Sequence, residues 1–442
     1  MALNLRSLWH AVVPSGLTTL YVSVGSGADT NNGLSPGSAF QTISKALSVA
    51  SPGTRIIVSA SGTYPYQSIY GLSGTSSAWV SIESANDTNR PLISVADNSG
   101  DDGVDVQLSN YVGLYGFEVE GLQTSTNTNP SGVCVFRGST FIRVWNNDIH
   151  DFPGGGVNCF YVAASNGLPA GSWDCVDVAF NQIYNCCKYN PDNTSGISFY
   201  GGQDTTGKTL DARYGYRAIG NYVWACECTV PYTPGGVNYV TDGNAISFDS
   251  LAVANNLNPG LSAYDKRGLA EANLAVGCGG RGLTIYNTID VDDFANTYIG
   301  NLQTISPNMS GGMDTEASYS PAWSGSNGVV HAGNVICPLN PNGDNTNDGV
   351  STYEGNVILG GTQAVASADI DKRSVGLAYW SALTQAMLAS VQPVSAFIPA
   401  ASDQVARQVG STGWQALGAG PRPVATWAAG ALEQPQGVRV AL

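Results

Sequence analysis

The residues best suited to chemistry lie between positions 240 and 316. The carboxylates among them are Asp242, Asp249, Asp314 and Glu316, and the cations are Lys266 and Arg281. Two carboxylates can serve as general acid and general base, whereas a lysine or arginine can remove a proton next to a carboxylate. Asp242 and Asp249 are also candidate ligands for Ca²⁺, which prefers oxygen. The alternative interpretation is a solvated surface with ordinary ion pairs.

A second set of residues is suited to holding sugar rings, whose apolar faces stack on aromatic side chains. Its members are Phe136, Phe160, Tyr200 and Tyr286, with Asn244 as a polar neighbour. On adjacent strands these rings would lie about 4.8 Å apart and form a platform. The alternative is that the rings cover one another or a loop.

Seven short stretches share a pattern that would place these residues side by side. They are 103–107, 132–136, 156–160, 196–200, 245–249, 282–286 and 312–316. Within each stretch apolar and polar residues alternate with period two, which is typical of a strand. Repeats of this size, without helices between them, indicate a solenoid. We therefore predict an all-β fold, a right-handed parallel β-helix.

The last residue of each stretch would face outward in this fold. The predicted column is Gln107, Phe136, Phe160, Tyr200, Asp249, Tyr286 and Glu316. Two long insertions, 201–217 and 249–267, follow directly after repeated strands and would emerge at the same edge. Long loops gathered on one face usually mark the binding side.

Asparagines and cysteines recur at fixed places in the repeat. Asn147, Asn181, Asn221 and Asn273 each stand five residues before Phe152, Cys186, Cys226 and Cys278, and Asn301, Asn334 and Asn356 follow. Asparagine tolerates the left-handed conformation and bonds to nearby backbone, so it suits a tight bend in every coil. The nine cysteines are an odd number, so at least one is unpaired. We interpret the recurring ones as buried thiols.

The chain divides into three predicted parts. Residues 1–65 form a leader and a cap, with a short helix marked by Phe40, Ile43, Leu47 and Ala50 and with Ser38 as its N-cap. Residues 66–360 form the coils. Residues 361–442 form a C-terminal cap, with an amphipathic helix over 371–391 and a tail. Short caps are expected because the open apolar ends of a solenoid need cover.

Composition excludes several classes of partner. The formal charge of the 442-residue chain is −15, so a nucleic-acid partner is not expected. No apolar stretch is long enough for a membrane span. The first ten residues lack the hydrophobic core of a signal peptide, although we expect an extracellular protein or one on a virion surface.

Several motifs resemble those of known polysaccharide lyases. They are Tyr21-Val-Ser with Ser35-Pro-Gly-Ser-Ala-Phe-Gln-Thr-Ile43 and Gly62-Thr-Tyr64, then Gly116-Phe-Glu-Val119, Thr241-Asp-Gly-Asn-Ala-Ile-Ser-Phe-Asp249, Gly279-Gly-Arg-Gly-Leu283 and Ala429-Gly-Ala-Leu-Glu433. The sequence resembles right-handed parallel β-helix polysaccharide-degrading proteins, above all polysaccharide lyase family 9, the pectate lyase-like group. The resemblance implies a Ca²⁺-dependent β-elimination on a uronic-acid polymer.

Three functions remain open at this point. In a lyase, Lys266 would be the base, Arg281 the partner of the uronate carboxylate, and Asp242 and Asp249 ligands of Ca²⁺. In a glycoside hydrolase of the phage tailspike type, Asp249 would act with Asp314 or Glu316, roughly 9.6 Å away by strand spacing. The third alternative is a non-catalytic glycan-binding protein of a virion or cell surface, either monomeric or homotrimeric.

Overall fold

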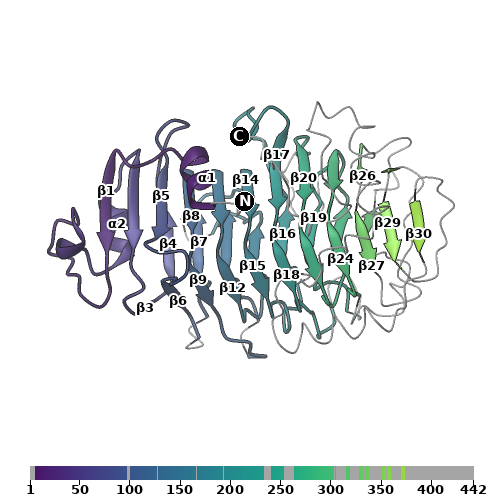
Figure 1. The fold of residues 1–442 in the computed structure, drawn as a ribbon, viewed down its shortest axis with the longest axis horizontal. Helices are drawn as coiled ribbons and strands as arrows, with labels where there is room; N and C mark the ends of the chain where they lie inside the picture. Colours follow the sequence, from purple (N-terminus) through teal and green to yellow (C-terminus); the bar gives the residue numbers. More distant parts are fainter. Residues whose placement is uncertain are drawn as a thin grey trace.

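The strands stack along one axis into an elongated solenoid (Figure 1). The computed structural model describes residues 5–96, 100–126, 128–165, 167–192, 194–232, 240–252, 263–302, 304, 315–318, 328–332, 334–337, 351–354, 356–359 and 370–373. Every described strand pairs in parallel with a strand of a neighbouring coil, and strands inside the sheets pair on both sides. This arrangement confirms the parallel β-helix, and crossovers between parallel strands are right-handed in nearly all proteins.

Three sheets run the length of the solenoid. Sheet A contains β1 (Thr18–Val22), β2 (Thr54–Val58), β5 (Val80–Ser84), β8 (Asn110–Tyr115), β11 (Ser139–Trp145), β14 (Trp173–Ala179), β17 (Tyr214–Ile219), β20 (Arg267–Glu271), β23 (Val291–Phe294), β26 (Val330–Ala332) and β28 (Thr352–Glu354). Sheet B contains β3 (Thr63–Tyr64), β6 (Leu92–Ser94), β9 (Glu118–Glu120), β12 (Asp148–His150), β15 (Gln182–Tyr184), β18 (Tyr222–Trp224), β21 (Leu274–Val276), β24 (Thr297–Ile299), β27 (Val335–Cys337), β29 (Asn356–Leu359) and β30 (Ile370–Arg373). Sheet C contains β4 (Gln67–Tyr70), β7 (Val104–Gln107), β10 (Val133–Phe136), β13 (Val157–Cys159), β16 (Ile197–Tyr200), β19 (Ile246–Asp249), β22 (Leu283–Tyr286) and β25 (Thr315–Ser318).

Sheet C is built from the repeated stretches of the sequence. Six of the seven predicted strands are found within one residue of the expected place. Their apolar residues face inward, as in the stacked set Ile197, Ile246 and Leu283, all fully buried. The seventh prediction was wrong by two residues, because β25 begins at Thr315 and pairs with Leu283 at that point. Strand β4 belongs to the same sheet and was not predicted.

A ladder of buried asparagines fixes the bend between sheets A and B. Its members are Asn147, Asn181, Asn221, Asn273, Asn296 and Asn334. At each step the backbone N–H of one asparagine donates to the side-chain oxygen of the next, at 2.7–3.1 Å. Asn296 occupies the place in the ladder that we had predicted for Asn301. The side chain of Asn301 instead accepts the backbone N–H of Cys278 at another bend. The residue before each of the first five of these asparagines is in the left-handed conformation, for example Asn146 with φ 55°.

The five cysteines near one bend are buried, as predicted. Their positions are Cys186, Cys187, Cys226, Cys228 and Cys278, and each side chain is at most 2% exposed. Their side chains belong to the main apolar core. They act as small core residues in the coils formed by β15, β18 and β21.

Two helices accompany the strands. Helix α2 (Ile43–Val49) packs beside β1 and β4 and buries Ile43, Ala46 and Leu47 in the main core, which confirms the short helix expected there. Its N-cap is Thr42, whose hydroxyl accepts the N–H of Lys45, and not Ser38. Residues 36–38 form a separate 3₁₀ turn that ends before the helix begins. Neither helix approaches the length of a membrane span, within the part of the chain described above.

Helix α1 (Leu5–Val12) lies against the outer face of sheet A (Figure 1). Its Trp9 ring is fully buried and lies 5.2 Å from Tyr115 and 5.8 Å from Trp145, between ring centroids. These residues belong to a second apolar cluster on the side of sheet A opposite the main core. The predicted leader is therefore a packed part of the solenoid surface.

Both predicted domain boundaries fall within continuous sheets. Strands β1 and β2 precede residue 66, and β30 follows residue 360. The helix predicted over 371–391 does not begin at 371, because residues 371–373 belong to β30. The rest of that segment lies outside the described residues, and the division at 65 and 360 stays a prediction.

The asparagine ladder yields a stability prediction. Asn221→Ala leaves Asn181 N–H and the Val178 carbonyl without their buried partners. We expect the free energy of unfolding to fall by about 2–4 kcal/mol, since each orphaned buried group costs about 1–3 kcal/mol. Urea denaturation followed by circular dichroism measures the change. Asn89→Ala, at an exposed turn, is the control, and equal midpoints for both variants would refute a stabilising ladder.

Candidate functional site

One column of side chains runs along the outer face of sheet C. The register aligns Tyr70 with Gln107 and Phe136 on one side, and Tyr200 with Asp249 and Tyr286 on the other. Cys159 pairs with Phe199, so the next residues, Phe160 and Tyr200, are neighbours in the column. Phe160 therefore lies between Phe136 and Tyr200. The column extends over six strand intervals, about 29 Å. Tyr70 was not singled out, although 67–70 alternates like the other strands.

The aromatic members of the column differ in exposure. Tyr70 is 52% exposed and Tyr286 is 46% exposed, while Tyr200 and Phe160 are half-buried. Phe136 is buried, with its ring stacked on Phe160 at a centroid distance of 5.0 Å and an interplanar angle of 18°. Phe136 is therefore covered, and the rings of the column that a ligand can reach are Tyr70, Phe160, Tyr200 and Tyr286.

Asp249 ends β19 and lies in a small polar group. Its neighbour in the coil is Asp242, whose charge acts on Asp249. Asp242 accepts hydrogen bonds from Thr241 Oγ1 and from Asn244 Nδ2, both at 2.7 Å. Asn244 is fully buried, and its side-chain oxygen accepts the N–H of Arg281 from the next coil at 2.8 Å. Hydrogen bonds thus join Asp242, Asn244 and the backbone of Arg281, and Asp249 lies close enough to Asp242 to be affected by its charge.

Burial controls the charge of Asp249. The carboxyl is half-buried, and one oxygen accepts the Ser250 hydroxyl at 2.7 Å. Burial, reinforced by the charge of Asp242, raises the pKa of Asp249 to about 7 despite that hydrogen bond. Burial also raises the pKa of Asp242, although Thr241 and Arg281 oppose it. A carboxyl that keeps its proton near neutral pH is suited to general acid catalysis.

The two carboxylates predicted at the far coil are placed differently. Asp314 lies outside the described residues. Glu316 pairs with Thr284 and not with Tyr286, because β25 begins two residues later than expected. The residue in the Asp249 column of that coil is Ser318. The predicted outward column is therefore wrong at its last position. Glu316 lies two residues before the position that aligns with Asp249, so the distance between these carboxylates combines the spacing of the coils with a displacement along the strand.

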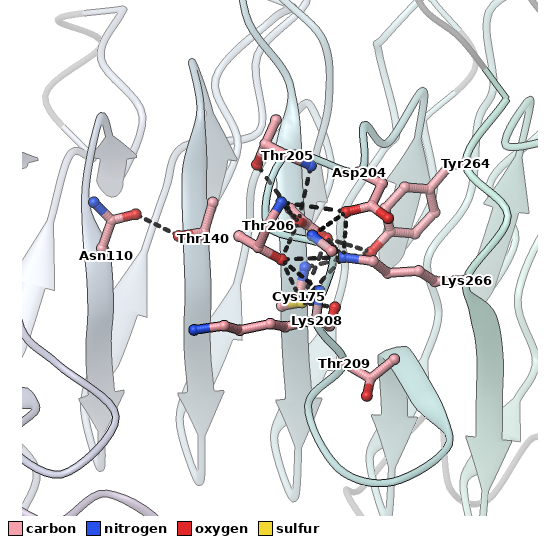
Figure 2. A network of polar contacts seen from close by, with 12 residues as sticks. Asn110, Thr140, Cys175, Asp204, Thr205, Thr206, Lys208, Thr209, Tyr264 and Lys266 are labelled. Carbon is pink, nitrogen blue, oxygen red and sulfur yellow. Dashed lines mark hydrogen bonds and ion pairs between the residues drawn. The ribbon is translucent and has the colours of Figure 1, made fainter.

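Lys266 lies in a polar network on sheet A (Figure 2). Its ammonium group donates to Asp174 at 2.6 Å, to Thr206 at 3.2 Å and pairs with Asp204 at 2.9 Å. Burial lowers the pKa of Lys266, but the hydrogen bonds that its ammonium group donates to Asp174 and Asp204 outweigh burial and raise it. The Tyr264 hydroxyl donates to the same Asp174 oxygen.

This placement argues against a catalytic role for Lys266. All its described polar contacts lie within the network of Figure 2, and none is with Asp242, Asp249 or Arg281. A raised pKa keeps the amine protonated, whereas a base must be free to accept a proton. The insertion that carries Asp204 and Thr206 folds onto sheet A and holds Lys266 there.

A second acidic group on sheet C was not singled out from the sequence. Asp102, Asp105 and Cys134 offer ligand atoms that all lie within 4.8 Å of one another. Tyr66 donates to Asp105 at 2.8 Å. Burial and the charge of Asp102 raise the pKa of Asp105 to about 7. The alternation within 103–107 and 132–136 placed Asp105 and Cys134 in one outward column, which is the signal that could have found them.

The predicted calcium ligands are only partly suited to Ca²⁺. The ion takes six to eight oxygen ligands. Both oxygens of Asp242 already accept hydrogen bonds, and the side-chain oxygen of Asn244 is bound to Arg281 N–H. Among the described residues, Asp242 and Asp249 do not form a group of three converging acidic, histidine or cysteine ligands. Calcium at this site stays a prediction, and no step below depends on it.

The fold is shared with enzymes that act on polysaccharides. No family model matches the sequence, and no curated protein sequence matches it. Among solved structures, pectate lyase Pel9A matches with a TM-score of 0.52 and 16% identity, over 82% of this chain and 81% of that chain. An alginate lyase from Paenibacillus sp. str. FPU-7 has a TM-score of 0.46 at 15% identity, over 80% and 100% of the chains. At these identities the likeness to Pel9A shows the β-helix fold alone.

The pKa of Asp249 predicts a pH effect on stability. Between pH 4 and 7 the folded chain keeps a proton that the unfolded chain, with a pKa of about 3.9, releases. The stabilisation of the folded chain by this retained proton therefore falls as the pH rises. Asp249→Asn removes this source of pH dependence. As the pH rises from 4.5 to 7.5, we expect the stability of the variant to gain about 3 kcal/mol relative to that of the wild type, since one pKa unit is worth about 1.4 kcal/mol. Urea denaturation across this range measures the difference, and parallel curves would contradict it.

Proposed function

We propose that the protein is a polysaccharide-cleaving enzyme that binds its substrate along the outer face of sheet C and cleaves it beside Asp249. The observation that carries the proposal is the position of Asp249. This carboxyl, with a pKa raised to about 7, lies in one column with Tyr200 and Tyr286. A protonated acid between two accessible rings combines a group for chemistry with a surface for sugar rings.

The β-helix fold supports the substrate class. The solved structure with a TM-score of 0.52 is a pectate lyase, and it covers most of both chains. The extended face of a solenoid suits an extended polymer, because every coil adds one more row of outward side chains. Such a polymer lies outside cells or on cell surfaces, in line with an extracellular or virion-surface location for the chain.

Hydrolysis is the reaction that the protonation of Asp249 favours. A glycoside hydrolase needs one carboxylic acid to protonate the leaving oxygen and one carboxylate to activate water or attack the sugar. Asp249 supplies the acid. Asp242 is the second carboxyl that the described residues bring near it, and Asp314 and Glu316 remain the candidates from the next coils. Arg281 acts on Asp242 and favours its charged form.

Elimination is the second candidate, and Arg281 favours it. A lyase on a uronic-acid polymer stabilises the sugar carboxylate, removes the proton next to it and expels the neighbouring glycosidic oxygen. Arg281 would bind the carboxylate, and Asp249 would return a proton to the leaving oxygen. Lys266 is excluded as the base by its ion pairs with Asp174 and Asp204. With Arg281 on the carboxylate, a described tyrosine such as Tyr286 would then take the proton.

The substitution Asp249→Asn tests the proposed role of Asp249 as the catalytic acid. The substitution keeps the size of the side chain and removes its acid, so we expect cleavage of a polysaccharide panel to fall by about 100-fold or more. Reducing-end release measures cleavage, and ultraviolet absorbance of an unsaturated product identifies elimination. Asp265→Asn, at an exposed carboxylate, is the control.

Three outcomes separate the alternatives. Equal activity of Asp249→Asn and the wild type would place the catalytic site elsewhere. Loss of activity with EDTA that Ca²⁺ restores would support a calcium lyase. Polysaccharide binding without any cleavage by the wild type would leave the glycan-binding protein as the function of this face.

The aromatic column yields a separate binding prediction. Tyr286→Ala removes a ring that is 46% exposed, so we expect polysaccharide affinity to fall about three- to tenfold while the melting temperature hardly changes. Affinity electrophoresis and thermal denaturation measure the two effects. Leu34→Ala, also at an exposed side chain but in the loop between β1 and residues 36–38, is the control. Unchanged affinity in both Tyr286→Ala and Tyr200→Ala would show that the polymer binds another face.

A further inference from the structure

A compact group of ligand atoms lies on sheet C near the N-terminal end of the solenoid. Asp105 on β7 pairs with Cys134 on β10, and both side chains point to the outer face. Asp102 precedes β7, and one of its oxygens accepts the backbone N–H of Ser131 at 2.7 Å. One ligand atom from each of Asp102, Asp105 and Cys134 lies within 4.8 Å of the others.

One oxygen of this group is buried without a partner. Asp105 is only 8% exposed. Its Oδ2 accepts hydrogen bonds from the Tyr66 hydroxyl at 2.8 Å and from Gln107 at 3.2 Å. Its Oδ1 is inaccessible to solvent and has no hydrogen-bond partner among the described residues. A buried carboxylate oxygen without a partner costs free energy, so such an atom points to a missing ligand.

We propose that Asp102, Asp105 and Cys134 bind a divalent cation that accepts both oxygen and sulfur ligands, of which Zn²⁺ is the main example. Zinc binds carboxylate oxygen at about 2.0–2.2 Å and thiolate sulfur at about 2.3 Å. Two such ligands on a tetrahedral ion are therefore about 3.4–3.6 Å apart, so ligand atoms that lie within 4.8 Å of one another need only small side-chain movements to bind the same ion. Three protein ligands leave a fourth position for water or substrate. A thiol ligand disfavours Ca²⁺ and Mg²⁺, which prefer oxygen.

The charges around the group fit a cation. The charged groups that act most on Asp102 and Asp105 are each other and Asp101. Cys134 is 2% exposed and faces the same carboxyls. A divalent ion would replace the protons of these acids and offset their mutual repulsion. Asp102 and Tyr66 are only half-buried, which leaves the group open to solvent on that side.

This cation site is separate from the proposed catalytic site. Strands β7 and β19 are four strand intervals apart in sheet C, about 19 Å. The same face carries both, so a polymer that extends along the column would pass near the ion. The inference does not depend on the proposed function, because its test measures metal binding and not cleavage.

The test is a titration of the full chain with Co²⁺, which reports zinc-type sites by its absorption. We expect one equivalent to bind with a thiolate-to-cobalt charge-transfer band, and Zn²⁺ to displace it. Cys134→Ser should abolish that band. Asp105→Asn should weaken Zn²⁺ binding by more than about tenfold in calorimetry, since even changes outside the ligand shell lower affinity by that much.

Matched controls distinguish this site from the other thiols. Cys228→Ser removes a buried cysteine that lies in another part of the core, and it should keep the full cobalt band. Metal-free melting curves show whether each variant folds. A band that survives Cys134→Ser and disappears with Cys228→Ser would move the metal to the buried cysteines and overturn the proposal. Absence of stoichiometric binding by the wild type would show that Asp102 and Asp105 share a proton instead.

Discussion

The parallel register between coils is the constraint on which the rest of this structure depends. Each coil must present its strand at the same height as its neighbours, because backbone hydrogen bonds join them along the axis. The asparagine ladder fixes this height at the bend between sheets A and B. The side-chain oxygen of Asn221 accepts the backbone N–H of Asn181 in the neighbouring coil, and its Nδ2 donates to the Val178 carbonyl. One side chain thereby satisfies backbone groups that no water reaches.

Because the register is fixed, the position of a residue within its strand determines where it lies on the surface. Residues at equivalent positions of successive strands form columns, so loops of any length can separate neighbours such as Tyr200 and Asp249. The same rule isolates sites from one another, because each coil contacts mainly the coils beside it. Sheet C can therefore carry an acidic group at β7 and another at β19, while the ion pairs of Lys266 belong to sheet A.

The alternating pattern within each strand was sufficient to predict sheet C and its inward face. This pattern depends only on residues close together in the sequence. Fully buried residues such as Ile246 are apolar, so the inward face is easily recognised. The sequence could not predict which loops fold back. The insertion after β16 brings Asp204 to Lys266, and nothing near either residue encodes that contact. The sequence also did not identify Asn296 as a member of the ladder. It lies 23 residues after Asn273, whereas the earlier ladder asparagines are separated by longer intervals.

Burial of carboxyls is the property that links the two groups on sheet C. The chain is strongly acidic, yet Asp105 and Asp249 are held where water cannot fully solvate a negative charge. Ordinary surface aspartates would be ionised and would do no more than keep the chain soluble. A buried carboxyl must keep a proton or gain a cation. Asp249 lies beside accessible rings and keeps a proton that it can donate, whereas Asp105 lies beside a thiol and a second carboxyl, which together suit a metal ion.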